Sequence, residues 1–166
     1  MMGRSSSAAV EAVYPGVSDN QALAASFRDK TFSWFRRNSG TALVESGIEH
    51  VYRYSYGAIF ADNQPLPGLG AWHTSELPEL FGTYNASTAT TAEKTLSNTF
   101  QTILANFIKN PKTSPAANWP EYGNGTIAIL AYNGIVNADN FVQPVSSKTL
   151  DGPCDALWDA FLDYRP

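Results

Sequence analysis

The stretch that determines the expected fold is GAWHTSELPELFG, residues Gly70 to Gly82. It places His73 on a glycine-flanked loop, directly before a short amphipathic helix. Ser75 is expected to cap this helix, Pro78 falls in its tolerated first turn, and Gly82 ends it. The apolar residues that share one face of the helix are Leu77, Leu80 and Phe81. Because loops commonly present reactive side chains and histidine is the usual general base at neutral pH, His73 is a candidate catalytic residue.

The sequence before this loop predicts helical structure and then a strand. A capping box at Ser18 and Gln21 opens apolar residues at nearly helical spacing, and Asn38-Ser39-Gly40 is expected to end them, so one long or two short helices fit. Residues His50 to Ile59, HVYRYSYGAI, are rich in β-branched and aromatic side chains and predict a strand. Two prolines and two glycines make residues 62–70 a loop.

The sequence after Gly82 predicts a long helix, two short strands and a final helix. The long helix has a capping box at Thr90 and Glu93 and ends at Asn110-Pro111. Its apolar stripe consists of Leu96, Phe100, Ile103, Leu104 and Phe107. The strands are expected at residues 126–132 and 141–145, the second at a sheet edge because of Pro144, and the last helix at residues 155–164.

This order of elements suits the C-terminal portion of an α/β fold. A complete doubly wound sheet needs several buried strands rich in valine and isoleucine that alternate with helices, and the sequence does not show them. We therefore expect an α/β structure with a partial sheet and flanking helices.

Composition narrows the classes of partner and cofactor. The 166 residues are 43% hydrophobic and 16% charged, which is typical of a globular domain. A net charge of -4 without a basic cluster argues against nucleic acid. The sequence contains neither a run of roughly 20 apolar residues that could cross a membrane nor the apolar core of a signal peptide at its N-terminus. No metal or cofactor is expected.

Two other residues need an interpretation of their own. His50, the second histidine, opens the predicted strand and is a weaker candidate than His73 for catalysis. Cys154 is the only cysteine, so an intrachain disulfide is impossible, and we expect it to be a small buried residue.

The loop of His73 resembles a known motif. Residues 70–82 are similar to the pattern G-A-x-H-x-x-E-[LI]-x-x-x-F-G of the type-B carboxylesterase and cholinesterase family, which includes fungal lipases of that group. Further similar features, in the family's order, are Tyr14-Pro15, Asp29 with Phe32, Val51-Tyr52-Arg53-Tyr54, Trp119-Pro120-Glu121-Tyr122, and Cys154 with Trp158, Phe161 and Leu162. The resemblance implies that residues 1–166 are the C-terminal part of a carboxylesterase type-B domain with the α/β-hydrolase fold. Trp34 stands where many members have a cysteine that pairs with the one at Cys154.

The resemblance implies hydrolysis of a small-molecule or lipid ester by a Ser-His-Glu/Asp triad with His73 as general base. In α/β-hydrolases the triad acid precedes the histidine, so Glu76 is expected instead to support the catalytic loop, by hydrogen bonds that anchor the loop and the start of the helix. The sequence contains no G-x-S-x-G nucleophile motif, no glycine-rich oxyanion loop and no acidic segment like that of the family. These parts are expected before Met1, in an N-terminal half of the same enzyme, and the chain alone is expected to be inactive.

One alternative function is a non-enzymatic, esterase-like interaction module, related to the adhesion proteins of this superfamily. The intact His73 favours the enzyme, because adhesion does not require an imidazole at this position. The resemblance also implies a secreted protein, in which the two sequons at Asn85 and Asn124 would be glycosylation sites.

Overall fold

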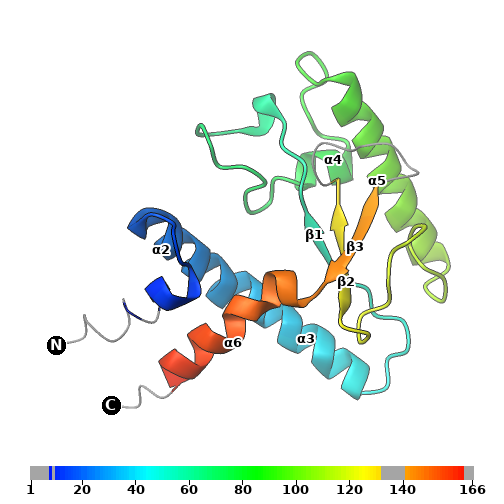
Figure 1. The fold of residues 1–166 in the computed structure, drawn as a ribbon. Coiled ribbons are helices and arrows are strands. Elements are labelled where there is room, and N and C mark those ends of the chain that lie inside the picture. Colours follow the sequence, from blue (N-terminus) through cyan, green and yellow to red (C-terminus); the bar gives the residue numbers. More distant parts are fainter. Residues whose placement is uncertain (1–7, 9, 132–140, 163–166) are drawn as a thin grey trace. The chain divides into compact units, whose positions relative to one another are not determined.

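The computed structural model describes residue 8, residues 10–131 and residues 141–162, with side chains as far as Leu157 (Figure 1). The chain forms two compact units. The helical unit comprises Met1–Ile48 and Ser146–Pro166, and the sheet unit comprises Glu49–Val145.

The helical unit contains α2 (Asp19–Arg28), a π-helical turn (Asp29–Ser33), α3 (Trp34–Glu45) and α6 (Lys148–Leu162). The predicted capping box of α2 is confirmed, with the Ser18 amide donating to Gln21 Oε1 at 3.1 Å. The predicted end at residues 38–40 is wrong, because α3 continues to Glu45 with Gly40 buried. A glycine inside a helix costs only about 1 kcal/mol, which packing can offset.

The last helix also begins earlier than predicted. The carbonyl of Ser147 accepts hydrogen bonds from the amides of Leu150 and Asp151, so helical turns start before residue 155. Pro153 is accommodated inside α6. Leu157 is buried as predicted, whereas the side chains of Trp158, Phe161 and Leu162 lie outside the described residues.

A buried carboxylate connects the elements of the helical unit. Asp29 is 1% exposed and accepts hydrogen bonds from Tyr14 Oη at 2.6 Å, Arg28 Nε at 2.6 Å and Ser33 Oγ at 3.0 Å. Burial, followed by the hydrogen bond to Asp29, raises the pKa of Tyr14. Cys154 is a free, buried thiol, as predicted, and donates to the Asp29 carbonyl at 3.6 Å. Both oxygens of the Asp29 carboxylate accept hydrogen bonds, which offset part of the cost of burying its charge.

The sheet unit is built on three strands in the order β1-β2-β3. They are β1 (Tyr54–Tyr56), β2 (Thr126–Leu130) and β3 (Val142–Ser146). β1 pairs with β2 in parallel, with Tyr54 opposite Ala128. A parallel pair needs a crossover, and the segment between these strands supplies it with α4 (Leu77–Phe81) and α5 (Thr91–Lys109).

The predicted strands are confirmed in position but not always in length. β1 is shorter than residues 50–59, because Tyr52 forms only an isolated antiparallel bridge with Glu121. β3 lies at the edge of the described sheet, as Pro144 predicted. The end of the first predicted downstream strand, Tyr132, lies outside the described residues. The helices and the small sheet confirm a partial α/β fold.

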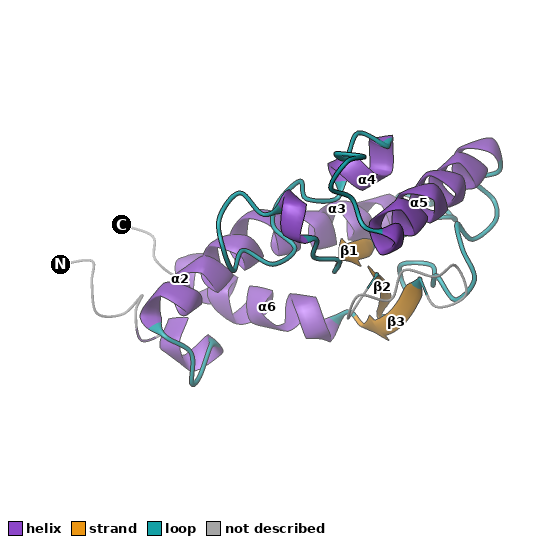
Figure 2. Cartoon of the chain, turned by 90° about the horizontal axis from the view of Figure 1, so that it is seen from above, coloured by secondary structure: helices purple, strands orange, loops and turns teal. Residues whose placement is uncertain are grey.

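The core of the sheet unit centres on α5. Its capping box is confirmed, because the Glu93 amide donates to Thr90 Oγ1 at 3.1 Å and the Thr90 amide to Glu93 Oε2 at 3.3 Å. Leu96 and Phe100 are 0% exposed, and the Phe100 ring packs against Tyr54, Tyr56 and Phe141. The remaining residues of the predicted stripe are buried or half-buried: Ile103, Leu104 and Phe107. Figures 1 and 2 show α4 lying beside α5.

Helix α4 turns a different face inward from the one that its apolar residues indicated. Leu80 packs on the core, but Leu77 is 39% and Phe81 68% exposed, while Glu79 is 0% exposed.

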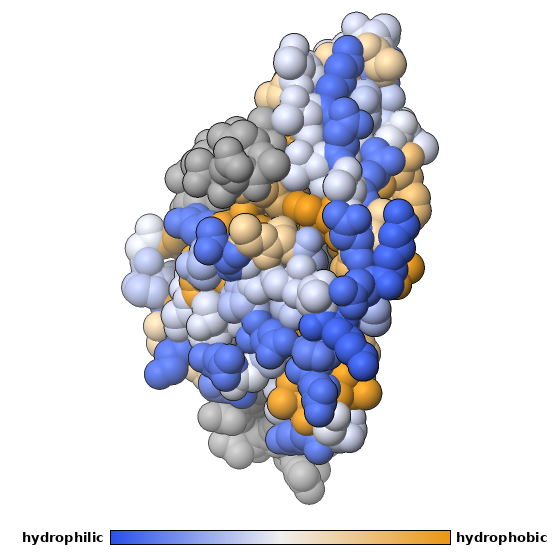
Figure 3. Space-filling model, turned by 90° about the vertical axis from the view of Figure 1, so that its right-hand side faces the viewer, coloured by the Kyte–Doolittle hydropathy of each residue, from blue (hydrophilic) through white to orange (hydrophobic). Residues whose placement is uncertain are grey.

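Figure 3 shows one face of the molecule, on which hydrophilic residues lie between smaller hydrophobic patches. Within the described ranges, no helix has the length and apolar composition that a membrane crossing requires.

Candidate active site

His73 lies on an exposed loop that connects β1 to α4. Three backbone hydrogen bonds shape this loop, from the amide of Trp72 to the carbonyl of Gly70 (3.0 Å), from Ser75 to Trp72 (3.0 Å) and from Leu77 to Thr74 (3.1 Å). Consecutive tight turns therefore surround the histidine. The predicted position of His73, on a loop directly before a helix, is confirmed.

The residue that follows the histidine has a strained backbone. Thr74 has a φ of 74°, in the left-handed region. A β-branched side chain in this region is a genuine conformational outlier, and such residues cost about 1–3 kcal/mol and cluster at functional sites. The backbone of the His73 loop is therefore strained at the residue next to the histidine.

A polar residue from the preceding turn holds both sides of the histidine. Asn63 ends the 3-10 helical turn Ala61–Asn63, and its side-chain Nδ2 donates to the Ser75 carbonyl at 2.7 Å. The Asn63 carbonyl accepts a hydrogen bond from Trp72 Nε1 at 2.8 Å. We call this pair of hydrogen bonds the Asn63 bridge. Beside it, Gln64 Nε2 donates to the Gly70 carbonyl at 2.9 Å. No sequence pattern indicated these contacts.

The predicted cap of α4 is wrong at its first residue. Ser75 is 2% exposed, its hydroxyl has no hydrogen-bond partner among the described residues, and the helix begins at Leu77. The N-cap residue is Glu76, whose half-buried side chain makes no capping hydrogen bond, so the hydrogen bond expected from Glu76 to the start of the helix is not formed. Ser75 does not cap the helix, because its backbone belongs to the turns of the loop, where its amide donates to the Trp72 carbonyl. The predicted end is confirmed, since Gly82 has a left-handed conformation with a φ of 65°.

Two buried carboxylates lie beneath the loop, where α4 meets α5. Glu79 is 0% and Glu93 1% exposed, and neither oxygen of the Glu79 carboxylate has a hydrogen-bond partner among the described residues. Burial, reinforced by the charge of Glu93, raises the pKa of Glu79 to about 7. Burial and the charge of Asp62 raise the pKa of Glu93, and burial and then Glu79 raise that of Tyr56. We call Asp62, Glu79 and Glu93 the acid cluster.

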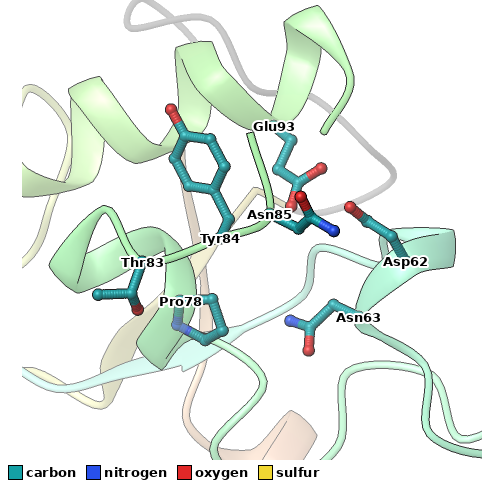
Figure 4. A pocket seen from close by; sticks show the side chains of 7 residues that line it. All are labelled: Asp62, Asn63, Pro78, Thr83, Tyr84, Asn85 and Glu93. Atoms are coloured by element: carbon teal, nitrogen blue, oxygen red, sulfur yellow. The ribbon is translucent and has the colours of Figure 1, made fainter. Parts of the chain in front are cut away.

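A small polar pocket of about 120 Å³ borders the acid cluster. Its lining consists of Asp62, Asn63, Pro78, Thr83, Tyr84, Asn85 and Glu93 (Figure 4). Figure 4 shows the side chains of Asp62, Asn85 and Glu93 turned towards one another. The hydroxyl of Thr88 donates to Asp62 Oδ2 at 2.7 Å. The pocket touches the His73 loop through Asn63, but His73 does not line it.

His50, the weaker candidate, has a carboxylate partner. Its Nδ1 lies 2.8 Å from Glu121 Oε1, which also accepts a hydrogen bond from Tyr52 Oη at 3.2 Å. The hydrogen bond to His50 is the main reason why the pKa of Glu121 is lowered. Next to the His50–Glu121 pair, the backbone amide of Tyr122 donates to the carbonyl of Val51 at 2.7 Å. The contact joins two strand-like segments, which gives His50 a structural explanation.

The remaining predicted positions are exposed. Asn85 lies on the loop after α4, and its Oδ1 accepts hydrogen bonds from the amide and hydroxyl of Ser87. Asn124 lies between two glycines with positive φ, in the turn before β2. In the part of the chain that the structure describes, no group of three or more histidine, cysteine or acidic residues could hold a metal ion.

Comparison with known proteins supports an esterase- or lipase-like family. The chain is 38% identical over 110 residues to secreted lipase 5 of Gibberella zeae, a match that covers 62% of this chain and 19% of that protein. It is 29% identical over 121 residues to chlorogenic acid esterase of Aspergillus niger, covering 62% of this chain and 23% of that enzyme. No family model matches the chain. The matched region thus corresponds to about a fifth of each relative's length.

The buried Glu79 carboxylate makes stability depend on pH. Its folded pKa of about 7 exceeds the ordinary 4.5, so the folded chain binds the proton more tightly than the unfolded chain. The contribution of Glu79 to the free energy of unfolding should therefore be fully present below about pH 4.5 and be lost as the pH rises through about 7. Glu79→Gln should raise the free energy of unfolding by about 3 kcal/mol at pH 8 and little at pH 4.5. Urea unfolding at the two pH values measures this difference. The exposed Glu49→Gln is the control, and an equal effect of Glu79→Gln at both pH values contradicts the account.

Replacing Thr74 by glycine should release the strain beside His73. Glycine occupies the left-handed region at no steric cost, so Thr74→Gly should raise the free energy of unfolding by about 1 kcal/mol. Thr113→Gly is the matched control, because Thr113 is an exposed loop residue without positive φ, and it should be neutral or destabilising. Denaturant unfolding compares the two variants. A loss of stability in Thr74→Gly equal to that of the control would show that Thr74 is not strained.

Proposed function

We propose that residues 1–166 are the C-terminal part of a type-B carboxylesterase domain with the α/β-hydrolase fold, in which His73 is the general base. The observation that carries this proposal is the His73 loop, where a motif similar to the family's is built around a strained, hydrogen-bonded turn. Retained backbone strain is typical of active sites. The names of the two relatives, a lipase and an esterase, support hydrolysis of a carboxylic ester as the reaction class.

In the proposed reaction a serine from outside these residues attacks the carbonyl carbon of an ester. The imidazole of His73 takes the proton of the serine hydroxyl and then donates it to the oxygen of the leaving alcohol, which leaves an acyl-enzyme. His73 next takes a proton from water, whose oxygen attacks the acyl group, and returns that proton to the serine. The exposure of His73 allows a nucleophile on another segment to reach it.

The serine, the oxyanion hole and the triad acid belong, in this proposal, to an N-terminal half of the same enzyme. The small-molecule or lipid ester would bind between that half and the His73 loop. Glu76 has a supporting role at the N-cap position of α4, three residues after the histidine. An acidic side chain at this position interacts favourably with the N-terminal end of a helix, which holds the end of the loop.

The 166-residue chain alone should be inactive, because its sequence lacks a G-x-S-x-G motif. The purified chain is expected neither to hydrolyse a p-nitrophenyl ester nor to be labelled by an organophosphonate. The coding DNA before Met1 should contain an in-frame G-x-S-x-G. Stoichiometric labelling of a serine in the chain would overturn the proposal, and the absence of such a motif upstream would favour the non-enzymatic interaction module.

We also propose that the protein is secreted and carries N-linked glycans at Asn85 and Asn124. The support is the exposure of both residues and the name of one relative, a secreted lipase. When the chain is secreted from a eukaryotic host, Asn85→Gln and Asn124→Gln should each remove one glycan, measured as the mass released by a peptide N-glycosidase. Asn106→Gln, an exposed asparagine outside any sequon, should release the same mass as the unchanged chain. An unglycosylated secreted chain contradicts this proposal.

A further inference from the structure

We propose that Asn63 is a positioning residue for His73, which it holds through hydrogen bonds to the residues on both sides of the histidine. This inference rests on the proposed function of His73 as general base. Asn63 lies ten residues before His73 in the sequence and does not belong to the motif of residues 70–82.

The two hydrogen bonds of the Asn63 bridge act on opposite sides of the histidine. The side-chain amide of Asn63 donates to the carbonyl of Ser75, two residues after His73, at 2.7 Å. The backbone carbonyl of Asn63 accepts from the indole of Trp72, directly before His73, at 2.8 Å. A movement of the histidine backbone relative to Asn63 must therefore lengthen at least one of these bonds.

The strain at Thr74 explains why the loop needs such a restraint. A threonine with a φ of 74° relaxes towards negative φ unless its neighbours prevent it. The Asn63 bridge fixes the carbonyl on one side of Thr74 and the tryptophan on the other side of His73. The direction of the His73 Cα–Cβ bond is thereby set by contacts outside the loop's own turns, which is the supporting shell that a precise catalytic group requires.

Asn63 is itself well anchored. Its amide donates to the carbonyl of Phe60 at 3.2 Å, which closes the 3-10 helical turn. Gln64 adds hydrogen bonds to the carbonyls of Asn63 (3.2 Å) and Gly70 (2.9 Å). Phe60 in turn packs against the core of the sheet unit. The restraint on His73 is thus transmitted from the core and not only from neighbouring loop residues.

The test is an NMR comparison of variants of the full 166-residue chain, made in bacteria so that no glycan is present. Asn63→Asp keeps the shape of the side chain and its backbone carbonyl but removes the donor to Ser75. Asn85→Asp is the matched control, because it makes the same chemical change in the lining of the same pocket without a bond to the loop. Trp72→Phe removes the indole donor together with part of the ring but keeps an aromatic side chain, and it serves if Asn63→Asp does not fold.

The readouts are the imidazole nitrogen resonances of the two histidines and amide hydrogen exchange. Asn63→Asp should shift or broaden the His73 ring signals and accelerate exchange at Ser75 and Leu77 by about fivefold to tenfold, the effect of losing one hydrogen bond. The His50 signals should not change, since that ring is paired with Glu121. Asn85→Asp should alter neither histidine. Trp72→Phe should act on His73 in the same direction as Asn63→Asp.

His73 signals in Asn63→Asp and Trp72→Phe that match those of Asn85→Asp overturn the proposal. Equal changes at His73 and His50 also overturn it, because they indicate general destabilisation and not positioning. The readout does not require catalysis, so it remains decisive for Asn63 whether or not His73 proves to be the general base. Conversely, a failure of the Asn63 test leaves the catalytic role of His73 open to its own kinetic test.

Discussion

The conformation of Thr74 is the constraint on which the architecture of the candidate site depends. A φ of 74° in a β-branched residue is unfavourable by itself, so the structure around it must supply the missing free energy. The tight turns of the loop, the Asn63 bridge and the start of α4 provide this restraint. Parallel pairing of β1 with β2 then fixes where the loop leaves the sheet. His73 is presented at the point where these restraints meet.

The acid cluster shows that the segment after His73 is not optimised for stability alone. Glu79 occupies the buried face of α4, with Glu93 and Asp62 near it, although an apolar residue there would avoid the cost of desolvation. The Ser97 hydroxyl of α5 donates to the Glu79 backbone carbonyl at 2.6 Å, which joins the two helices but does not solvate the carboxylate. The packing of α4 on α5 should therefore weaken as Glu79 and Glu93 ionise. The His73 loop thus leads directly into α4, a helix whose packing depends on the protonation of Glu79.

Features that depend on neighbouring residues were predictable. Features that depend on distant residues, or on backbone groups already hydrogen-bonded elsewhere, were not. The capping box at Thr90 and Glu93 and the stop at Gly82 follow from neighbouring residues, and both were correct. Ser75 looked like a cap because its side chain suits one, but its backbone belongs to the turns of the loop. The Asn63 bridge joins residues 9 and 12 positions apart through common residue types, so no periodicity or motif indicates it. A motif that resembles the family's made His73 a candidate, whereas the strain at Thr74 was found only in the structure.

The most direct test of the central claim is the catalytic constant of the protein expressed together with the N-terminal half that the proposal requires. In that protein His73→Ala should lower kcat by about a thousandfold or more with little change in KM, because a general base acts on the chemical step and contributes little to substrate binding. His50→Ala is the matched control and should retain most of the activity, since His50 pairs with Glu121. Parental kcat in His73→Ala, or loss of activity in His50→Ala alone, would contradict the account.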